Sequence, residues 1–276
     1  MAIAEDLRAL VTHLLKFLAP RHRAREAVLS RSLPEPLQQQ LLQRSRHYRR
    51  LPPEVRAEFN RQIQVFMTEK PVTPVHARVT GEIRLLTAAS AVTLSAGWPG
   101  YTWDQLREVL IYPKGFDEEY RFVETGQRNR DAARKRHCHL AGQAHPWGVV
   151  ILSKPSLTRS FAARENNYHV GLHEFAHLLD LARSDFDGVP SYLSDERASA
   201  WAALLTREDE RLRGGDSLLD PYGLSHPAEL FAVAVEAFFQ NPVAVAASHG
   251  ELYKFLATYF NQDPAAWARS AARQDG

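Results

Sequence analysis

The spacing of apolar residues predicts that the first third of the chain is helical. Apolar side chains recur there every three or four positions, which places them on one face of a helix. Pro53 is expected in the first turn of one helix, where proline is tolerated. The last of these segments is rich in alanine and leucine, which is typical of a buried helix. The predicted helices occupy residues 5–18, 32–51, 53–70 and 79–95.

Short apolar runs in the middle of the chain predict a small sheet. Residues 109–113 and 120–124 form two such runs, and residues 147–153 form the clearest one, bounded by Pro146 and Pro155. Helical spacing then returns to the end of the chain, at residues 167–180, 195–212, 227–239, 251–260 and 264–273. This order predicts an α+β fold that is mostly α-helical with a small mixed sheet.

Composition narrows the class of protein. The chain has 276 residues, of which 45% are hydrophobic and 24% charged, as in ordinary globular proteins. The net charge of +2 gives no electrostatic case for nucleic acid. Cys138 is the single cysteine, which excludes an intrachain disulfide and suits a reducing compartment. The N-terminus lacks the features of a signal peptide, and no apolar run approaches the ~20 residues that span a bilayer. We therefore expect a cytoplasmic protein without direct contact to nucleic acid or membrane.

The strongest chemical signal is an H-E-x-x-H sequence, which runs from His173 to His177. Residues four apart lie on one face of a helix, so the two imidazoles can bind one Zn²⁺. Glu174 lies near the same face, where it can take a proton from a water that the metal activates. The flanking residues are apolar, and burying two imidazoles and a carboxylate there would be costly without a partner. The sequence therefore predicts one zinc ion per chain.

A catalytic zinc site has a third protein ligand, which must come from outside the motif. A third histidine in the metzincin position is excluded, because residues 178–183 read Leu-Leu-Asp-Leu-Ala-Arg. The candidates for the third ligand are the downstream carboxylates Asp180, Asp187, Glu196, Glu229 and Glu236. Glu229 and Glu236 are seven residues apart and share one face of an apolar helix. The economical assignment makes Glu229 the ligand and Glu236 its supporting neighbour.

Other candidates around this motif have simpler interpretations. The strand at 147–153 is either an edge strand that pairs with a peptide substrate or a plain core strand. The basic segment 125–137 lacks the aromatic residues of a nucleic-acid arm, and residues 137–139 are expected to bind no metal. His169 is expected to cap a helix or to lie in the core, and His226 is not expected to be a ligand.

The motifs of the C-terminal half resemble the Mlc titration factor A family of zinc peptidases. The resemblance rests on His173–Asp180, Gly188–Pro190, Tyr222 and Pro227–Phe239, and it extends from about residue 50 to 265. Upstream, Tyr112-Pro113 and the strand from Gly148 to Ser153 are also similar, whereas Gln143 and Lys154 depart from the family pattern.

The resemblance implies a set of structural and chemical expectations. It implies a zincin-like fold related to the anthrax lethal factor catalytic domain. We expect residues 1–75 to form an N-terminal helical region packed on a catalytic domain at 76–276, as one continuous globular unit. The resemblance also implies that Glu229 is the third zinc ligand, that Glu174 is the catalytic base and that Tyr222 lies in the site. The Tyr222 hydroxyl would then stabilise the oxyanion that forms when a peptide carbonyl is attacked.

Two functions follow from these expectations. The first is a zinc-dependent, aminopeptidase-like enzyme that hydrolyses peptide substrates, with Glu174 as general base. The resemblance also implies a partner, because the best-known family member binds Mlc, a glucose-responsive transcriptional repressor that controls sugar uptake. The alternative is therefore a regulator-binding protein that sequesters a transcription factor and in which catalysis is absent or secondary.

Overall fold

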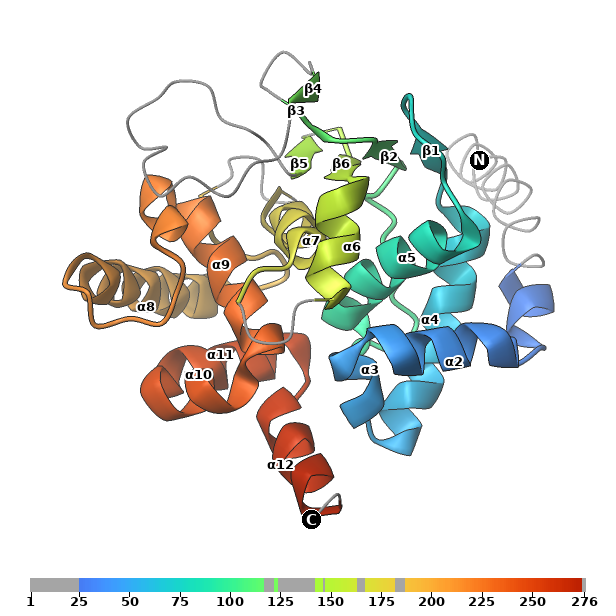
Figure 1. The fold of residues 1–276 in the computed structure, drawn as a ribbon. Helices are drawn as coiled ribbons and strands as arrows, with labels where there is room; N and C mark the ends of the chain where they lie inside the picture. Colours follow the sequence, from blue (N-terminus) through green and yellow to red (C-terminus); the bar gives the residue numbers. More distant parts are fainter. Residues whose placement is uncertain are drawn as a thin grey trace, which may run out of the picture.

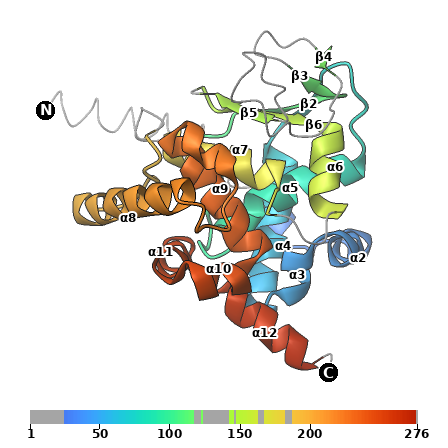
Figure 2. The ribbon, with the colours of Figure 1, turned by 60° about the vertical axis from the view of Figure 1, so that its left-hand side comes forward.

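Helices make up most of the part of the chain that the structure describes, and a small mixed sheet lies at one end of them (Figures 1 and 2). The structure is a computed structural model and describes residues 25–116, 122–123, 142–145, 147–162, 167–181 and 187–274. Within these residues the fold is α+β, as the sequence predicts. The predicted helix at 5–18, the basic segment 125–137 and residues 137–139 lie outside the described residues.

The described N-terminal helices lie close to their predicted positions. They are α2 (Glu35–Arg44), α3 (Arg46–Arg50), α4 (Pro53–Glu69) and α5 (Gly81–Ser95). The segment predicted as one helix at 32–51 is divided at Ser45, whose side chain accepts a hydrogen bond from the Tyr48 N–H and caps α3. Thr80 caps α5 in the same way. Every residue of α5 from Leu85 to Ser95 is buried, which explains its alanine-rich sequence.

The main sheet has four strands in the order β1-β2-β6-β5. Strands β1 (Val72–Pro74), β2 (Glu108–Tyr112) and β6 (Val149–Ser153) are parallel, and β5 (Gly142–His145) is antiparallel to β6. A separate two-stranded sheet pairs β3 (Gly115–Phe116) with β4 (Phe122–Val123), which confirms a strand within the run at 120–124.

The sheet corrects the edge-strand interpretation of residues 147–153. Strand β6 lies between β2 and β5, so both of its edges are paired and it is a core strand. Its side chains from Val150 to Ser153 are buried accordingly. Among the described strands, the edge position on this side of the sheet belongs to β5.

The second half of the chain forms the helices that carry and surround the H-E-x-x-H sequence. They are α6 (Lys154–Ala162), α7 (Val170–Asp180), α8 (Asp195–Arg213), η3 (Pro221–Ser225), α9 (Pro227–Gln240), α10 (Pro242–Ser248), α11 (Gly250–Phe260) and α12 (Pro264–Gln274). Helices α6 and α10 were not predicted. Pro155 marked the end of a strand in the sequence analysis, but it lies in the first turn of α6, where no intrahelical N–H is needed. Pro242 lies in the first turn of α10 in the same way.

One hydrophobic cluster runs through the described helices and the inner face of the sheet. It includes Leu41 and Phe59 near the N-terminus, Phe175 on α7, and Phe238 and Phe260 near the C-terminus. Helix α7 therefore lies inside a continuous core, packed against α5, α9 and β5. No single helix among the described residues is long and apolar enough to cross a membrane. Helices α9 and α10 together reach that length and apolar character, but the chain bends by 117° between them.

Candidate metal centre

Helix α7 places the two histidines of the H-E-x-x-H sequence side by side. Its start is fixed by His169, whose ring Nδ1 accepts a hydrogen bond from the Leu172 N–H, so the capping role expected for His169 is confirmed. The rings of His173 and His177 are one turn apart, with centroids 4.8 Å from each other. Gly171 permits the close approach of α5, because a Cβ there would lie 2.2 Å from the Ser90 Oγ.

Helix α9 brings two carboxylates to these histidines. Pro227 occupies the first turn and His226 caps the helix, its ring Nδ1 accepting from the Ala228 N–H. Glu229 follows in the same turn and is partly exposed, whereas Glu236 lies two turns further along and is 1% exposed. The two side chains reach opposite nitrogens of one imidazole: Glu229 Oε2 is 2.8 Å from His173 Nε2, and Glu236 Oε1 is 2.7 Å from His173 Nδ1.

Glu229 also lies beside the second histidine, which completes a group of three. Its Oε1 atom is 3.5 Å from the Nε2 atom of His177. The group His173, His177 and Glu229 offers one ligand atom each, all within 4.8 Å of one another. Two imidazole nitrogens and a carboxylate oxygen form a donor set that zinc prefers. The closeness and the chemistry of these three side chains therefore fit a bound metal ion.

The charges around His173 support the same interpretation. Burial opposes its protonation, but hydrogen bonds to Glu229 and Glu236 outweigh that effect and raise the pKa of His173 well above its usual value. Burial would raise the pKa of Glu229, yet hydrogen bonds with His173 and His177 lower it overall. The site thus carries carboxylates that favour a positive charge at its centre, whether a proton or a metal ion.

Glu174 lies next to the group on the same helix. Its side chain is 5% exposed and reaches toward strand β5. A Cβ atom built on Gly142 would lie 2.5 Å from both the Cγ and the Oε1 of Glu174. The absence of a side chain at residue 142 therefore makes the space that the Glu174 carboxyl group occupies.

Tyr222 lies on the open side of the group. It belongs to η3, whose start is capped by Asp220, and its side chain is 41% exposed. Its ring centroid is 6.1 Å from that of His173, with the ring planes tilted by 42°. The short helix η3 packs against α9, so the tyrosine and Glu229 are carried by neighbouring elements.

The other carboxylates considered as ligands lie outside the group. Asp180 is fully buried, and its Oδ2 atom accepts a hydrogen bond from the Gly188 N–H at 3.0 Å. Asp187 is exposed and accepts from the Val189 N–H, and Glu196 is exposed on α8. Gly142 was not singled out from the sequence; the one signal was its place directly before Gln143, in the position of a glycine that the family pattern contains.

Comparison with known proteins identifies relatives over most of the chain. An uncharacterized protein, slr2042, from Synechocystis is 28% identical over 248 residues, covering 86% of this chain and 87% of that protein. Mlc titration factor A from Enterobacter is 29% identical over 222 residues, covering 76% and 80%. The protein of the same name from Edwardsiella ictaluri is 30% identical over 211 residues, covering 72% and 74%.

A match to a protein family also covers most of the chain. Residues 19–261 fit the pattern of a family described as glucose-regulated metallo-peptidase M90. That span contains α7, α9 and every residue of the group that fits a metal. Since it covers most of the sequence, this chain belongs to the glucose-regulated metallo-peptidase M90 family.

Proposed function

We propose that this protein is a zinc-dependent, aminopeptidase-like peptidase with His173, His177 and Glu229 as metal ligands. The observation that carries the proposal is that two imidazoles and a carboxylate from different helices meet within 4.8 Å, with Glu174 beside them. Three protein ligands leave one position open, as a catalytic zinc site requires. When bound, zinc would supply Lewis acidity, which lowers the pKa of a water and polarises a peptide carbonyl.

Glu174 is proposed as the general base. Its carboxyl group is next to the ligand group in a buried setting, so a proton can pass from the attacking water to Glu174 and from there to the leaving amine. Glu236 is proposed to position His173, because its hydrogen bond to Nδ1 directs the Nε2 atom toward Glu229.

Tyr222 is proposed to stabilise the transition state. Its exposed ring near His173 can direct the hydroxyl group toward a substrate carbonyl, where developing negative charge needs a hydrogen-bond donor. Its role can be measured separately from metal binding, because Tyr222 is not one of the three proposed metal ligands.

Strand β5 is proposed to hold the substrate. Among the strands that the structure describes, it is the edge strand beside α7, and an extended peptide can add to such an edge through main-chain hydrogen bonds. Gly142 on this strand faces Glu174, so a peptide paired there would pass the proposed base. We also propose that the protein has a zincin-like fold, in which residues 1–75 pack on a catalytic domain at 76–276. We propose a cytoplasmic location as well.

Hydrolysis of aminoacyl chromogenic substrates tests the enzyme directly. The zinc-loaded protein is expected to cleave them, a chelator to stop cleavage, and Glu174→Gln to lower kcat by several orders of magnitude while zinc content stays at one per chain. Glu26→Gln, an exposed carboxylate far from α7 in sequence, serves as the matched control. Full turnover by a zinc-loaded Glu174→Gln protein would exclude Glu174 as the base.

The alternative is a regulator-binding protein that sequesters a transcription factor. The names of two relatives refer to Mlc, and we propose a glucose-responsive repressor of this kind as a partner. Pull-down of purified repressor by the wild type and by His173→Ala separates the two functions. Repressor binding together with no hydrolysis by the zinc-loaded wild type would favour the binding protein.

A further inference from the structure

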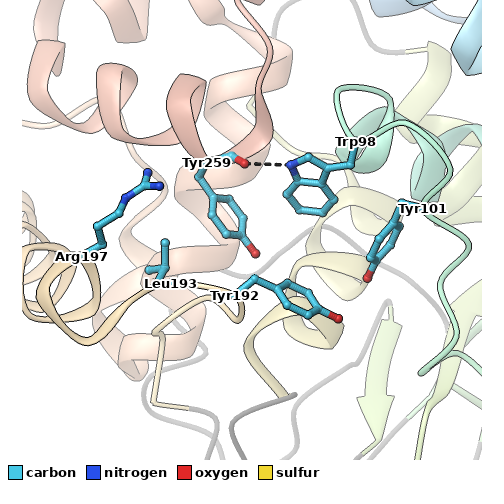
Figure 3. Close-up of a pocket in the computed structure, with 6 residues that line it drawn as sticks. All are labelled: Trp98, Tyr101, Tyr192, Leu193, Arg197 and Tyr259. Atoms are coloured by element: carbon cyan, nitrogen blue, oxygen red, sulfur yellow. Dashed lines mark hydrogen bonds between the residues drawn. The ribbon is translucent and has the colours of Figure 1, made fainter.

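A second cavity lies apart from the metal centre. Its volume is about 450 Å³, and it is lined by Trp98, Tyr101, Tyr192, Leu193, Arg197 and Tyr259 (Figure 3). These residues come from the segment after α5, the segment before α8, the first turn of α8, and α11. None of them belongs to the group that fits a metal. The volume is in the range of cavities that hold small ligands.

Aromatic rings form most of the cavity wall and meet edge to face. The ring of Trp98 lies 5.2 Å from that of Tyr101 and 5.3 Å from that of Tyr259, with interplanar angles of 66° and 85°. Tyr192 meets Tyr101 at 6.5 Å and 84°. Packing of this kind leaves ring faces and edges available for another flat ring.

The Tyr259 hydroxyl group is a buried donor in this wall. The residue is 6% exposed, and its hydroxyl oxygen has no hydrogen-bond partner among the described residues. Its backbone oxygen accepts a hydrogen bond from the Trp98 indole N–H at 2.9 Å (Figure 3). A buried hydroxyl group without a partner is energetically unfavourable, and an acceptor on a ligand would remove that penalty.

Arg197 supplies a positive charge on the other side of Tyr259 from Trp98 and Tyr101 (Figure 3). Its guanidinium carbon lies 5.7 Å from the centre of the Phe255 ring. Within the part of the chain that the structure describes, no carboxylate lies within ion-pair distance of this side chain. The guanidinium therefore keeps its paired donors available for a carboxylate.

Tyr192 lines the cavity and has an unfavourable backbone conformation. Its φ angle is +67°, and its side chain is 69% exposed. A tyrosine in the left-handed region is uncommon and costs free energy, and such residues cluster at ligand sites. The neighbouring Ser191 N–H donates to the Leu179 carbonyl at 2.8 Å, which anchors this turn to the end of α7.

We propose that this cavity binds an aromatic carboxylate. The flat ring would lie among Trp98, Tyr101 and Tyr192, while the carboxylate pairs with Arg197 and accepts a hydrogen bond from the Tyr259 hydroxyl group. Two sources share this chemistry: a free aromatic acid and the C-terminal aromatic residue of a peptide. The site goes beyond the proposed peptidase function and does not depend on it.

Nuclear magnetic resonance of the full, zinc-loaded chain tests the proposal. The protein is labelled with ¹⁵N, and the Trp98 indole signal is assigned with Trp98→Phe. Phenylacetate and N-acetyl-Gly-Phe are the two probes, and benzylamine has the same kind of ring with the opposite charge. We expect phenylacetate, the peptide or both to shift the Trp98 signal saturably, and benzylamine to leave it unchanged. Carboxylate binding to the metal alone would not move this signal.

Two substitutions test whether the Arg197 guanidinium and the Tyr259 hydroxyl group bind the carboxylate. Arg197→Met is expected to weaken binding roughly 10-fold or more, and Tyr259→Phe by about 5-fold, since the second removes only one hydrogen bond. Arg207→Met is the matched control, because Arg207 lies on the same helix and pairs with Glu251 instead. Its affinity is expected to equal that of the wild type.

The outcome also separates the two sources. A shift with phenylacetate assigns a free acid, and a shift with N-acetyl-Gly-Phe alone assigns a peptide C-terminus; either supports the proposal. No Trp98 shift with either probe, equal binding of benzylamine, or wild-type affinity in a folded Arg197→Met protein would overturn it.

Discussion

Adding one methyl group at Gly142 is expected to disable catalysis without removing the metal. In Gly142→Ala the new Cβ would lie 2.5 Å from the Cγ and Oε1 atoms of Glu174, whereas ordinary contacts begin at 3.4 Å. Glu174 must then move by about 1 Å, since Gly142 is held in the strand pairing of β5 with β6. A misplacement of ~1 Å at a catalytic group can cost on the order of 10²-fold in rate.

Steady-state hydrolysis and metal analysis measure this effect together. Gly142→Ala is expected to lower kcat about 100-fold while the zinc content stays at one per chain, because the three atoms nearest to the new Cβ all belong to Glu174, which is not one of the three ligands. Gly81→Ala is the matched control, since no atom lies within 4 Å of a Cβ at that position. A Gly142→Ala enzyme with wild-type kcat and full zinc loading would refute the placement of Glu174 as the base.

Three further substitutions probe separate parts of the structure. Tyr222→Phe is expected to reduce kcat by 10-fold or more with unchanged zinc content, and an unchanged kcat would remove this hydroxyl from the mechanism. Glu236→Gln should weaken zinc affinity 10–100-fold in a competition titration, because it loses the charged partner of His173 Nδ1; wild-type affinity would argue against that support. Burial lowers the pKa of His47 to about 3, so its contribution to stability is present above pH 6.5 and is lost as pH falls toward 3. Between pH 7.5 and 5, the free energy of unfolding measured with urea should therefore fall by about 2 kcal/mol less in His47→Phe than in the wild type. An equal fall in both proteins would contradict the burial argument.

The sequence predicts which residues can form a metal-binding group, because the spacing of these residues along each helix is local information. The spacing of His173 and His177 determines that they share a helix face, and the apolar run from Pro227 determines that Glu229 and Glu236 share another. Only the meeting of α7 with α9 had to come from the structure. The roles of these residues in catalysis stay predictions until the variants above are measured.

Structural features that depend on contacts between distant segments could not be predicted from the local spacing of apolar residues. The order of β5, β6 and β2 is set by pairing between segments, so the apolar run at 147–153 reads the same in a core or an edge position. The second cavity draws its lining from separate segments between Trp98 and Tyr259, and no spacing rule connects them. Gly142 matters only because Glu174 packs against it across the fold.

Glu236 ties the start of α7 to the ring that it orients. One of its oxygens is bonded to His173 Nδ1, and the other accepts from the backbone N–H of His169, the residue that caps the helix. A single buried carboxylate thus holds both the ring direction and the helix start through hydrogen bonds within the protein. We therefore expect the protein to stay folded when a bound divalent cation is removed with a chelator and replaced.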